Sequence, residues 1–366
     1  MTLRFLTSGE SHGKCLNAII EGIGAGFELD FDFINSELKA RQGGAGRGGR
    51  MKIETDTINF NSGVRFQKTT GAPICLEIKN RDWQNWTIPM SVEKLDENAL
   101  TPEQREQLKE RYIEKLRPGH ADYSGAIKYN QKDIRNILER SSARETATRV
   151  AVGAICQNIL KNFDIEFECG VSSLCGEENS EKFEEIIEKA KELGESLGGR
   201  VWVKIKNLPV GLGSFVHWDR RLDSRLAGAV MSVPAIKSVE IGLGAKCADD
   251  FGSKIHDEFF TQNEKITRGS NNAGGIEGGM TNGQDVVIHA AMKPIPTMKK
   301  PLKSINFNTL EACEAHFERA DTCAVEACAT VVKNMCAIII LDAFFEKFGC
   351  DNFEEIKKNF NNNAKR

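Results

Sequence analysis

Two histidines of the chain stand in tight turns beside groups that could orient them or attract an anion. His12 follows Ser11 in the stretch TSGESHG, where glycines on either side let the backbone approach a ligand closely. His120 lies in LRPGHADYSG, where a Pro-Gly turn projects the ring and Arg117 and Asp122 are near in sequence. Imidazole titrates near neutral pH, so either ring could move a proton. The plainer interpretation is an exposed histidine in one turn and, in the other, a salt bridge worth less than about 1 kcal/mol.

Three other stretches concentrate positive charge in loops. KARQGGAGRGGRMK, residues 39–52, holds five basic side chains among glycines and contains no acid; we call it the basic loop. In RSSARETATR, Arg140 and Arg144 lie about one turn apart ahead of a helix, whose N-terminus attracts anions, although Ser142 could simply cap that helix. MKPIPTMKKPLKS, residues 292–304, sets four lysines among three prolines, which suits a phosphate or an ordinary solvated edge.

Two late stretches add an acid and a glycine turn. HFERADTCA holds Arg319 and Asp321 just before a predicted helix, so Asp321 is either a functional acid or that helix's N-cap. GGIEGGMTNGQ places Gly278 in a turn. Together, turns that carry histidine, arginine, lysine and an acid favour a multiply anionic small molecule, because guanidinium groups bind carboxylate and phosphate in a bidentate way. In that interpretation the basic loop is a lid that closes over the anion.

Composition limits the alternatives. The 366 residues are 40% apolar and 28% charged, with a net charge of −3, which is typical of a soluble globular protein. Such a balance argues against a dedicated nucleic-acid binder, since those domains are usually strongly basic. The N-terminus lacks the apolar segment of a signal peptide, and the late run MCAIIILDAFF is interrupted by Asp342 and is too short to span a bilayer. We therefore expect neither a membrane nor a nucleic-acid partner.

The cysteines indicate a reducing compartment. There are eleven, an odd number, with no Cys-x-x-Cys pair, so reduced thiols and a cytoplasmic location are expected. Cys313, His316, Cys323 and Cys328 form the one group that could suggest a metal, but their spacing fits no standard zinc pattern. The prediction is that no metal is bound.

Two rival functions rest on glycine motifs. GRGGR is similar to the Arg-Gly-Gly tracts of RNA-binding tails, yet it is short, internal and flanked by regular patterns. GIGAGF, residues 22–27, could suggest a dinucleotide-binding enzyme, but its glycine spacing differs from that fingerprint and no parallel strand with an acidic end follows it. Both remain weaker alternatives.

The elements that must position these residues alternate irregularly between strands and helices. Strands are expected within 16–29, 51–64, 71–80, 200–213, 238–246 and 284–295, and helices within 30–42, 102–116, 141–160, 180–199, 219–233 and 324–347. Ser142 and Glu145 are predicted to form a capping box. Since strict alternation of strand and helix is absent, we predict an α+β fold with antiparallel sheets.

Taken in order, the motifs resemble the chorismate synthase family. The motifs that carry the resemblance, spread over residues 3–348, are GESHG, RQGGAGRGGRM, SGVRFQKTTGAPI, RPGHADY, RSSARETATRVAVGAI, GGIEGGMTNG, MKPIPT and ERADTCA. The resemblance implies a β-α-β sandwich with helices between antiparallel sheets, a single domain over residues 1–366, and a homotetramer. It also implies a lyase of the shikimate pathway to aromatic amino acids, which converts 5-enolpyruvylshikimate-3-phosphate to chorismate and phosphate by trans-1,4-elimination.

The same resemblance implies a cofactor and residue roles. The cofactor is reduced FMN, and NADPH is needed only if the protein reduces its own flavin. His12 protonates the departing phosphate, His120 lies beside the reduced flavin, and Asp321 helps to remove the substrate's ring hydrogen. The implied substrate-binding residues are Ser11, Arg41, Arg47, Arg50, Arg117, Arg144 and Arg319. The implied FMN-binding residues are Arg140, Ser141, Ser142, Pro234, Ala235, Gly278, Lys293, Pro294, Ile295, Pro296, Thr297 and again Arg319. Ser238, Ala320 and Glu326 depart from residues that are common in the family.

Overall fold

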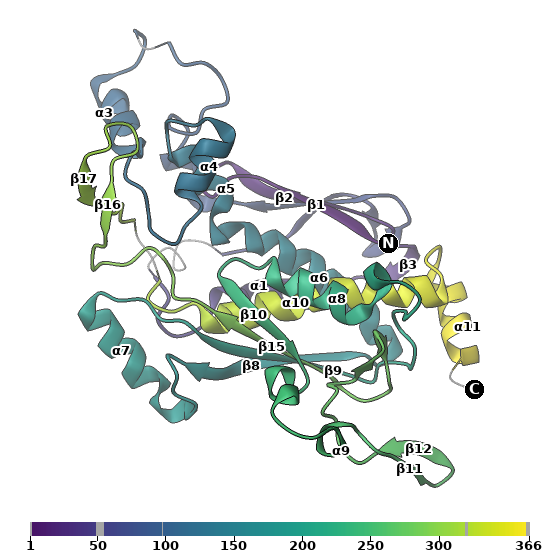
Figure 1. The fold of residues 1–366 in the computed structure, drawn as a ribbon. Coiled ribbons are helices and arrows are strands. Elements are labelled where there is room, and N and C mark those ends of the chain that lie inside the picture. The colour runs from purple at the N-terminus through teal and green to yellow at the C-terminus, as the bar shows by residue number, and fades with distance from the viewer. Residues whose placement is uncertain (1, 49–54, 97, 319–320, 364–366) are drawn as a thin grey trace.

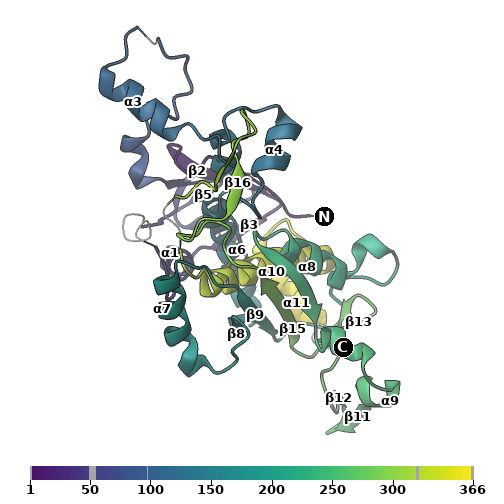
Figure 2. The ribbon, with the colours of Figure 1, turned by 60° about the vertical axis from the view of Figure 1, so that its left-hand side comes forward.

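A layer of helices lies between two antiparallel sheets in the computed structural model, which describes residues 2–48, 55–96, 98–318 and 321–363 (Figure 1). A second view shows the same three layers (Figure 2). The first sheet contains, in spatial order, β1 (Arg4–Ser8), β2 (Cys15–Glu21), β7 (Ile74–Lys79) and β4 (Asn59–Ser62). The second contains β10 (Ile236–Ile241), β15 (Val286–Met292), β9 (Gly199–Lys206) and β8 (Glu166–Leu174). The predicted α+β sandwich is thus confirmed.

Each sheet turns one apolar face to the helices. In β15, every second residue of VVIHAAM is buried, as the period of a strand with one covered face requires. The same alternation runs along ICLEIK in β7. The helical layer consists of α1 (Phe31–Gln42), α6 (Thr146–Leu160), α8 (Leu222–Met231) and α10 (Val325–Phe348). Because α6 and α10 are enclosed, α6 buries fourteen of its fifteen residues and α10 is apolar around most of its circumference.

Helix α10 is long and apolar enough to cross a membrane by length and composition, and 89% of its most apolar stretch is buried inside the molecule. Its buried face packs against α6, β8 and β9. Asp342, the charge that interrupts this helix, accepts hydrogen bonds from the backbone N–H groups of Thr2 and Leu3 at 2.6 and 2.7 Å and pairs with Arg225. Helix α10 therefore serves as the core helix of this fold.

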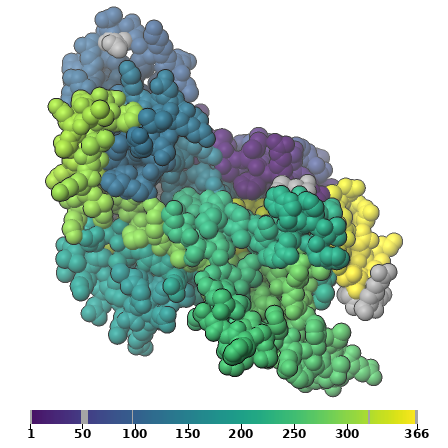
Figure 3. Space-filling model, in the orientation of Figure 1, coloured from purple at the N-terminus to yellow at the C-terminus, as the bar shows by residue number. Residues whose placement is uncertain are grey.

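A smaller lobe at one end has its own apolar cluster. Ile113, Leu116, Ala126, Ile134 and Leu138 form this cluster, with Phe307 packed against it. Its chain segments are far apart in sequence but adjacent in space, as the contact between the blue and lime-green regions in Figure 3 shows. The lobe contains η1 (Arg81–Asn85), α3 (Pro102–Arg111), α4 (Asp122–Tyr129), α5 (Arg135–Ser141), β16 (Lys303–Ile305) and β17 (Ala312–Glu314).

The remaining elements belong to neither main sheet, nor to the helical layer, nor to the smaller lobe. They are β3 (Ala25–Glu28), β5 (Val64–Arg65), β6 (Lys68–Thr70), β11 (Phe259–Gln262), β12 (Lys265–Arg268), β13 (Ile276–Glu277), β14 (Met280–Thr281), α7 (Phe183–Leu193), α9 (Gly252–Ile255), α11 (Phe353–Asn363), η2 (Ala143–Glu145), η3 (Lys161–Phe163), η4 (Ser180–Lys182), η5 (Trp218–Arg220) and η6 (Gly244–Ala248).

Three local predictions were wrong. The helix expected over 102–116 ends at Arg111, because the N–H of Ile113 bonds to the Asp133 side chain instead. The Ser142–Glu145 capping box does not form: Ser142 caps the N–H of Arg144, while the Glu145 carboxylate binds Arg149 and the Thr7 hydroxyl. Of the strand pair expected over 51–64, residues 51–54 lie outside the described part, and β4 and β5 belong to different sheets.

Candidate active site

A cavity of about 460 Å³ brings together most of the residues singled out in the sequence. Its walls come from the turn after β1, the end of α1, the turn before α4 and the α5–η2 junction. The loop before β10, the loop after β15, the segment before α10 and the first turns of α10 complete them. The predicted site residues that line it are Ser11, His12, Arg41, Arg47, Arg117, His120, Ser141, Ser142, Arg144, Pro234, Ala235, Lys293, Ile295, Pro296, Thr297 and Asp321. Segments separated by up to about three hundred residues therefore meet in one place.

Two buried arginines share one buried carboxylate at the base of the cavity. Arg144 Nη1 lies 2.7 and 2.8 Å from the two carboxylate oxygens of Asp56, and Arg41 Nη1 lies 3.3 Å from one of them. Arg41 also donates to the Thr146 hydroxyl and the Ala143 carbonyl, and Arg144 donates to the Asn80 side chain. Burial, together with the neighbouring positive charge of Arg144, lowers the pKa of Arg41 to about 10. With two guanidinium groups for one carboxylate, this wall remains cationic and rigid.

His120 belongs to a buried triad. Asp122, whose side chain is fully buried, accepts from Arg117 Nε at 2.8 Å and Nη2 at 2.7 Å and lies 2.9 Å from His120 Nδ1. Burial alone would raise the pKa of Asp122, but hydrogen bonds from Arg117 and His120 outweigh burial and hold that pKa far below its usual range. Arg117 Nη2 lies 3.0 Å from the same Nδ1, so both partners hold the ring by this nitrogen and Nε2 is the nitrogen left for the cavity.

His12 is held in a similar way by a residue distant in sequence. Its Nδ1 lies 2.8 Å from Glu139 Oε1, and its backbone N–H donates to Glu139 Oε2 at 2.7 Å. Its ring stacks on Trp86, with ring centroids 3.9 Å apart and planes 27° apart. Burial would raise the pKa of Glu139, but the hydrogen bond from His12 and the charges of His12 and Arg135 lower it. The ring is thus fixed at its edge and on one face.

Asp321 contacts the basic loop and does not cap α10. Arg47 Nη1 lies 2.9 Å from Asp321 Oδ2, and the Gly48 N–H donates to Asp321 Oδ1 at 2.6 Å. The N-cap position of α10 is Ala324, which has no side-chain cap. Gly46 has φ +78°, and a Cβ there would lie 2.9 Å from the Cys323 Cβ, so only glycine lets the loop pack this closely.

The opposite wall of the cavity is mostly aliphatic. It is formed by Val233, Pro234, Ala235, Met292, Ile295, Pro296, Ala324, Ala327, Cys328 and Val331. Burial raises the pKa of the Cys328 thiol to about 12, so this sulfur is an apolar surface and not a nucleophile. Ala235 has φ +71°, an uncommon conformation for a residue with a Cβ, and its carbonyl accepts the N–H of Lys293. Lys293 in turn reaches the carbonyl of Gly119, which joins the lysine-proline loop to the His120 turn.

The structure does not bring every predicted residue to the cavity wall. Arg140 is exposed and donates to the carbonyls of Thr7 and Gly9. Pro294 and Gly278 are exposed and do not line the cavity, and Gly278 lies in the turn between β13 and β14. Arg50 and Arg319 lie outside the described residues.

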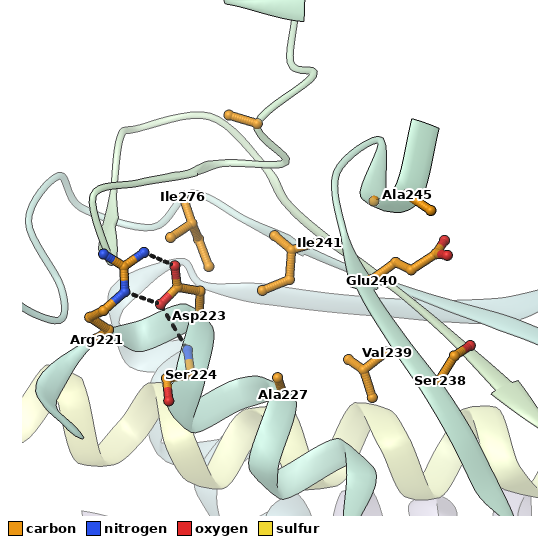
Figure 4. Close-up of a pocket in the computed structure, with 12 residues that line it drawn as sticks. Arg221, Asp223, Ser224, Ala227, Ser238, Val239, Glu240, Ile241, Ala245 and Ile276 are labelled. Atoms are coloured by element: carbon orange, nitrogen blue, oxygen red, sulfur yellow. Dashed lines mark hydrogen bonds and ion pairs between the residues drawn. The ribbon is translucent and has the colours of Figure 1, made fainter. Parts of the chain in front are cut away.

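Two other parts of the molecule differ from this cavity: the Cys313–Cys328 group and a second, more open hollow. Among the residues that the structure describes, no group of three His, Cys, Asp or Glu side chains could hold a metal, and His316 instead pairs with Glu318 at 3.4 Å. A more open hollow of about 800 Å³ lies between α8 and β10 (Figure 4). Its charged Arg221 and Asp223 face each other there, with Arg221 Nε 3.1 Å from Asp223 Oδ1. None of the predicted site residues lines this hollow.

Sequence reasoning missed the partners that hold the predicted residues. Glu139, Trp86, Asp56 and Asn80 carried no signal of their own, because each lies far along the chain from the side chain that it contacts. Only their residue types, acidic, aromatic or amide, could have suggested a role as partners of the predicted site residues. A buried glutamate one helical turn from Arg135 looks like an ordinary ion pair of a helix.

A cavity with fixed cations, two imidazoles held by carboxylates and an aliphatic wall suits an enzyme that acts on a multiply anionic small molecule. Comparison with known proteins specifies the class. Residues 3–345 match the family model described as Chorismate synthase. The chorismate synthase of Thermoanaerobacter pseudethanolicus is 52% identical over 359 residues, covering 98% of this chain and 97% of that relative. That of Aquifex aeolicus is 48% identical over 393 residues, covering 98% and 96%.

A solved structure agrees. A crystal structure of chorismate synthase matches with a TM-score of 0.77 and 41% identity, covering 100% of this chain and 98% of the other. The chain belongs to the chorismate synthase family. It is a lyase of the shikimate pathway that eliminates phosphate from 5-enolpyruvylshikimate-3-phosphate to give chorismate, in a family that uses reduced flavin.

Proposed function

We propose that the 460 Å³ cavity is where this elimination occurs, with the substrate between the cationic wall and reduced FMN on the aliphatic wall. One observation carries the proposal: His12, His120 and Asp321, distant in sequence, line a single cavity, and both imidazoles have Nδ1 on a buried carboxylate. That geometry leaves both Nε2 atoms for chemistry. A merely structural histidine has no reason to share a cavity with four arginines.

The arginines bind the substrate. It carries two carboxylates and a phosphate, so a cavity without fixed cations would repel it. Arg41, Arg117 and Arg144 are already held by buried carboxylates, so they lose little freedom when an anion arrives. Arg47 exchanges its contact with Asp321 for the substrate, and Ser11 adds a hydroxyl. Arg50 and Arg319 keep their assignment to this set from the resemblance alone.

The ionisable side chains move the protons. His12 donates from Nε2 to an oxygen of the departing phosphate, and its Nδ1–H stays on Glu139. His120 presents Nε2 towards the flavin while Arg117 and Asp122 fix its ring. Once Arg47 turns to the substrate, the Asp321 carboxylate helps to accept the ring hydrogen. Expulsion of water would strengthen each of these contacts.

The aliphatic wall suits the flavin. A flat ring system needs an apolar surface, which Val233, Met292 and Val331 provide, and Lys293 at its edge suits the cofactor's negative charge. The residues that would hold the cofactor are Ser141, Ser142, Pro234, Ala235, Lys293, Ile295, Pro296 and Thr297 at the cavity, with Arg140, Gly278, Pro294 and Arg319 assigned from the resemblance. When bound, reduced flavin supplies the electron density that the elimination requires, without net oxidation or reduction.

The wider context follows from the same family. We propose that the chain forms one domain and a homotetramer, works in the cytoplasm, and takes up flavin reduced elsewhere, so that NADPH is not its own substrate. Oxidation of NADPH by the purified protein with FMN would contradict the last point. Salt-sensitive retention of RNA would instead favour the nucleic-acid alternative for the basic loop.

The proposed roles are tested by replacing the histidines. His12→Ala and His120→Ala should each fold normally and lower kcat with reduced FMN by about 10²–10⁴-fold, the usual contribution of a positioned acid or base. His256→Ala, at an exposed position after α9, is the control and should keep the wild-type rate. A wild-type kcat in either cavity variant would remove that histidine from the proposed mechanism.

A further inference from the structure

Glu139 makes three hydrogen bonds to the turn that carries His12. Its Oε2 accepts from the His12 backbone N–H at 2.7 Å, and its Oε1 lies 2.8 Å from His12 Nδ1. Its own backbone carbonyl accepts from the Ser11 N–H at 3.0 Å. One residue at the end of α5 therefore fixes both the backbone and the ring of a residue 127 positions earlier in the chain.

The Glu139 carboxylate is buried among polar and charged partners. Its side chain is 2% exposed, and leaving a charge this buried without partners is costly. Arg135, four residues earlier in α5, lies 3.4 Å from Oε1 and is itself paired with Glu318 at 2.6 Å. Against the effect of burial, the contacts with His12, and after them the charge of Arg135, hold the pKa of Glu139 below its usual value, and an ionised carboxylate can only accept hydrogen bonds.

We propose that Glu139 is the positioning residue for His12: its carboxylate holds the hydrogen on Nδ1 and turns Nε2 towards the cavity as the proton donor. This proposal rests on the role proposed for His12 above. When His12 acts, the Nε2–H bond breaks and an O–H bond forms on the departing phosphate. The ring becomes neutral, and its Nδ1–H remains bonded to Glu139.

Trp86 completes the arrangement. It stacks on the ring of His12, and its Nε1 donates to Asp82 at 3.0 Å. The guanidinium groups of Arg111 and Arg135 make cation–π contacts with the Trp86 ring, at 4.2 and 5.2 Å from its centroid. With one face on Trp86 and one edge on Glu139, the imidazole cannot rotate without losing both contacts.

Charged groups approach His12 from several elements. Glu139 and Arg135 approach from α5, Arg111 from the end of α3 through Trp86, and Glu10 lies in the same turn near Gly13. The cavity itself adds cations, namely Arg41, Arg47, Arg117 and Arg144, and the ionisable groups His120, Glu318 and Asp321. Glu139 is the carboxylate in direct contact with the ring, so it is the group that determines which ring nitrogen faces the cavity.

The test compares Glu139→Gln with Glu139→Asp. Glu139→Gln should lower kcat about 10- to 100-fold, as loss of a partner behind a working group usually does, with KM nearly unchanged. Glu139→Asp keeps the charge and should restore part of kcat. Glu37→Gln is the matched control, a buried glutamate held by Lys333 and Asn334 that should lose stability but keep the wild-type kcat.

A second readout needs neither flavin nor substrate. Nitrogen NMR of protein labelled on histidine should show His12 with hydrogen on Nδ1 in the wild-type protein, identified by its loss in His12→Ala, and should lose this preference in Glu139→Gln. A wild-type His12 spectrum with hydrogen on Nε2 in the neutral ring, or no change in Glu139→Gln, would overturn the proposal even if the variant proved unstable. A wild-type kcat in His12→Ala would instead reject the role of His12, whatever the spectrum shows.

Discussion

At the scale of single residues, the site uses buried carboxylates to fix cations and imidazoles before any ligand arrives. Asp56 holds two arginines, Asp122 holds Arg117 and His120, and Glu139 holds His12. Each carboxylate is buried and hydrogen-bonded, so replacing it would lower the stability of the folded protein. The positions of the proposed catalytic groups are therefore coupled to the stability of the fold.

This dependence predicts the behaviour of Asp122→Asn. Since the pKa of Asp122 in the folded state lies below its unfolded value of about 4, its ionised form adds stability above that pH, and this is lost as the pH falls towards the folded value. Asp122→Asn should cost about 3–5 kcal/mol at pH 7, as breaking a buried pair does, and the difference should shrink on acidification. Urea unfolding at pH 7 and at lower pH measures both.

The matched control is Glu168→Gln, whose exposed carboxylate pairs with Lys206 at the surface. It should unfold like the wild-type protein at every pH, because water screens such a pair. A constant gap between wild-type protein and Asp122→Asn from pH 7 to pH 3 would contradict the assignment of a depressed pKa to Asp122.

At the scale of the elements, the position of the site depends on two core helices that approach closely. Gly153 of α6 faces α10, and a Cβ there would lie 2.3 Å from the Asn334 carbonyl oxygen and 2.5 Å from its Cβ. Helix α6 follows directly on the η2 turn that carries Arg144, and α10 begins just after Asp321. The spacing of the two helices therefore sets the distance between the cationic wall and the acid.

This contact predicts that Gly153→Ala destabilises the fold by about 1–3 kcal/mol, because the added methyl group overpacks a backbone that cannot move freely. Gly228→Ala is the control: Gly228 lies in α8, with nothing within 4 Å of its Cβ position. Gly228→Ala should raise the free energy of unfolding by about 0.5–1 kcal/mol, because alanine has a higher helix propensity than glycine. Thermal or urea unfolding of both variants measures this difference. Equal stability of Gly153→Ala and Gly228→Ala would contradict the close packing of α6 against α10 at Gly153.

The elements also show what could be read from the sequence. Strands and helices with strong periodicity, such as 286–292 and 325–348, were predicted correctly, because burial of one face or of the whole element leaves a clear pattern. The Ser142–Glu145 capping box failed because tertiary contacts claimed the Glu145 side chain. His12 and His120 were singled out because glycine turns mark them, and the structure places both at the cavity. Glu139 and Trp86 were missed because contacts between distant segments leave no local spacing to recognise.

At the scale of the whole molecule, the two sheets and the helices between them bury a single continuous set of apolar side chains. The cavity lies where this core meets the smaller lobe, so residues from both contribute to its walls. The single domain proposed above predicts one cooperative unfolding transition. Coincident transitions by far-UV circular dichroism and by tryptophan fluorescence would agree with this expectation; separate transitions would contradict it.

The central claim is that scattered cations, two oriented imidazoles and one acid form a site that eliminates phosphate only beside reduced flavin. The direct measurement is anaerobic rapid mixing of the protein with FMN and 5-enolpyruvylshikimate-3-phosphate, following flavin absorbance and phosphate together. With reduced FMN, a transient change in flavin absorbance should accompany one phosphate per site, and oxidised FMN should give neither. Equal phosphate release with oxidised FMN, or with no flavin at all, would contradict the account.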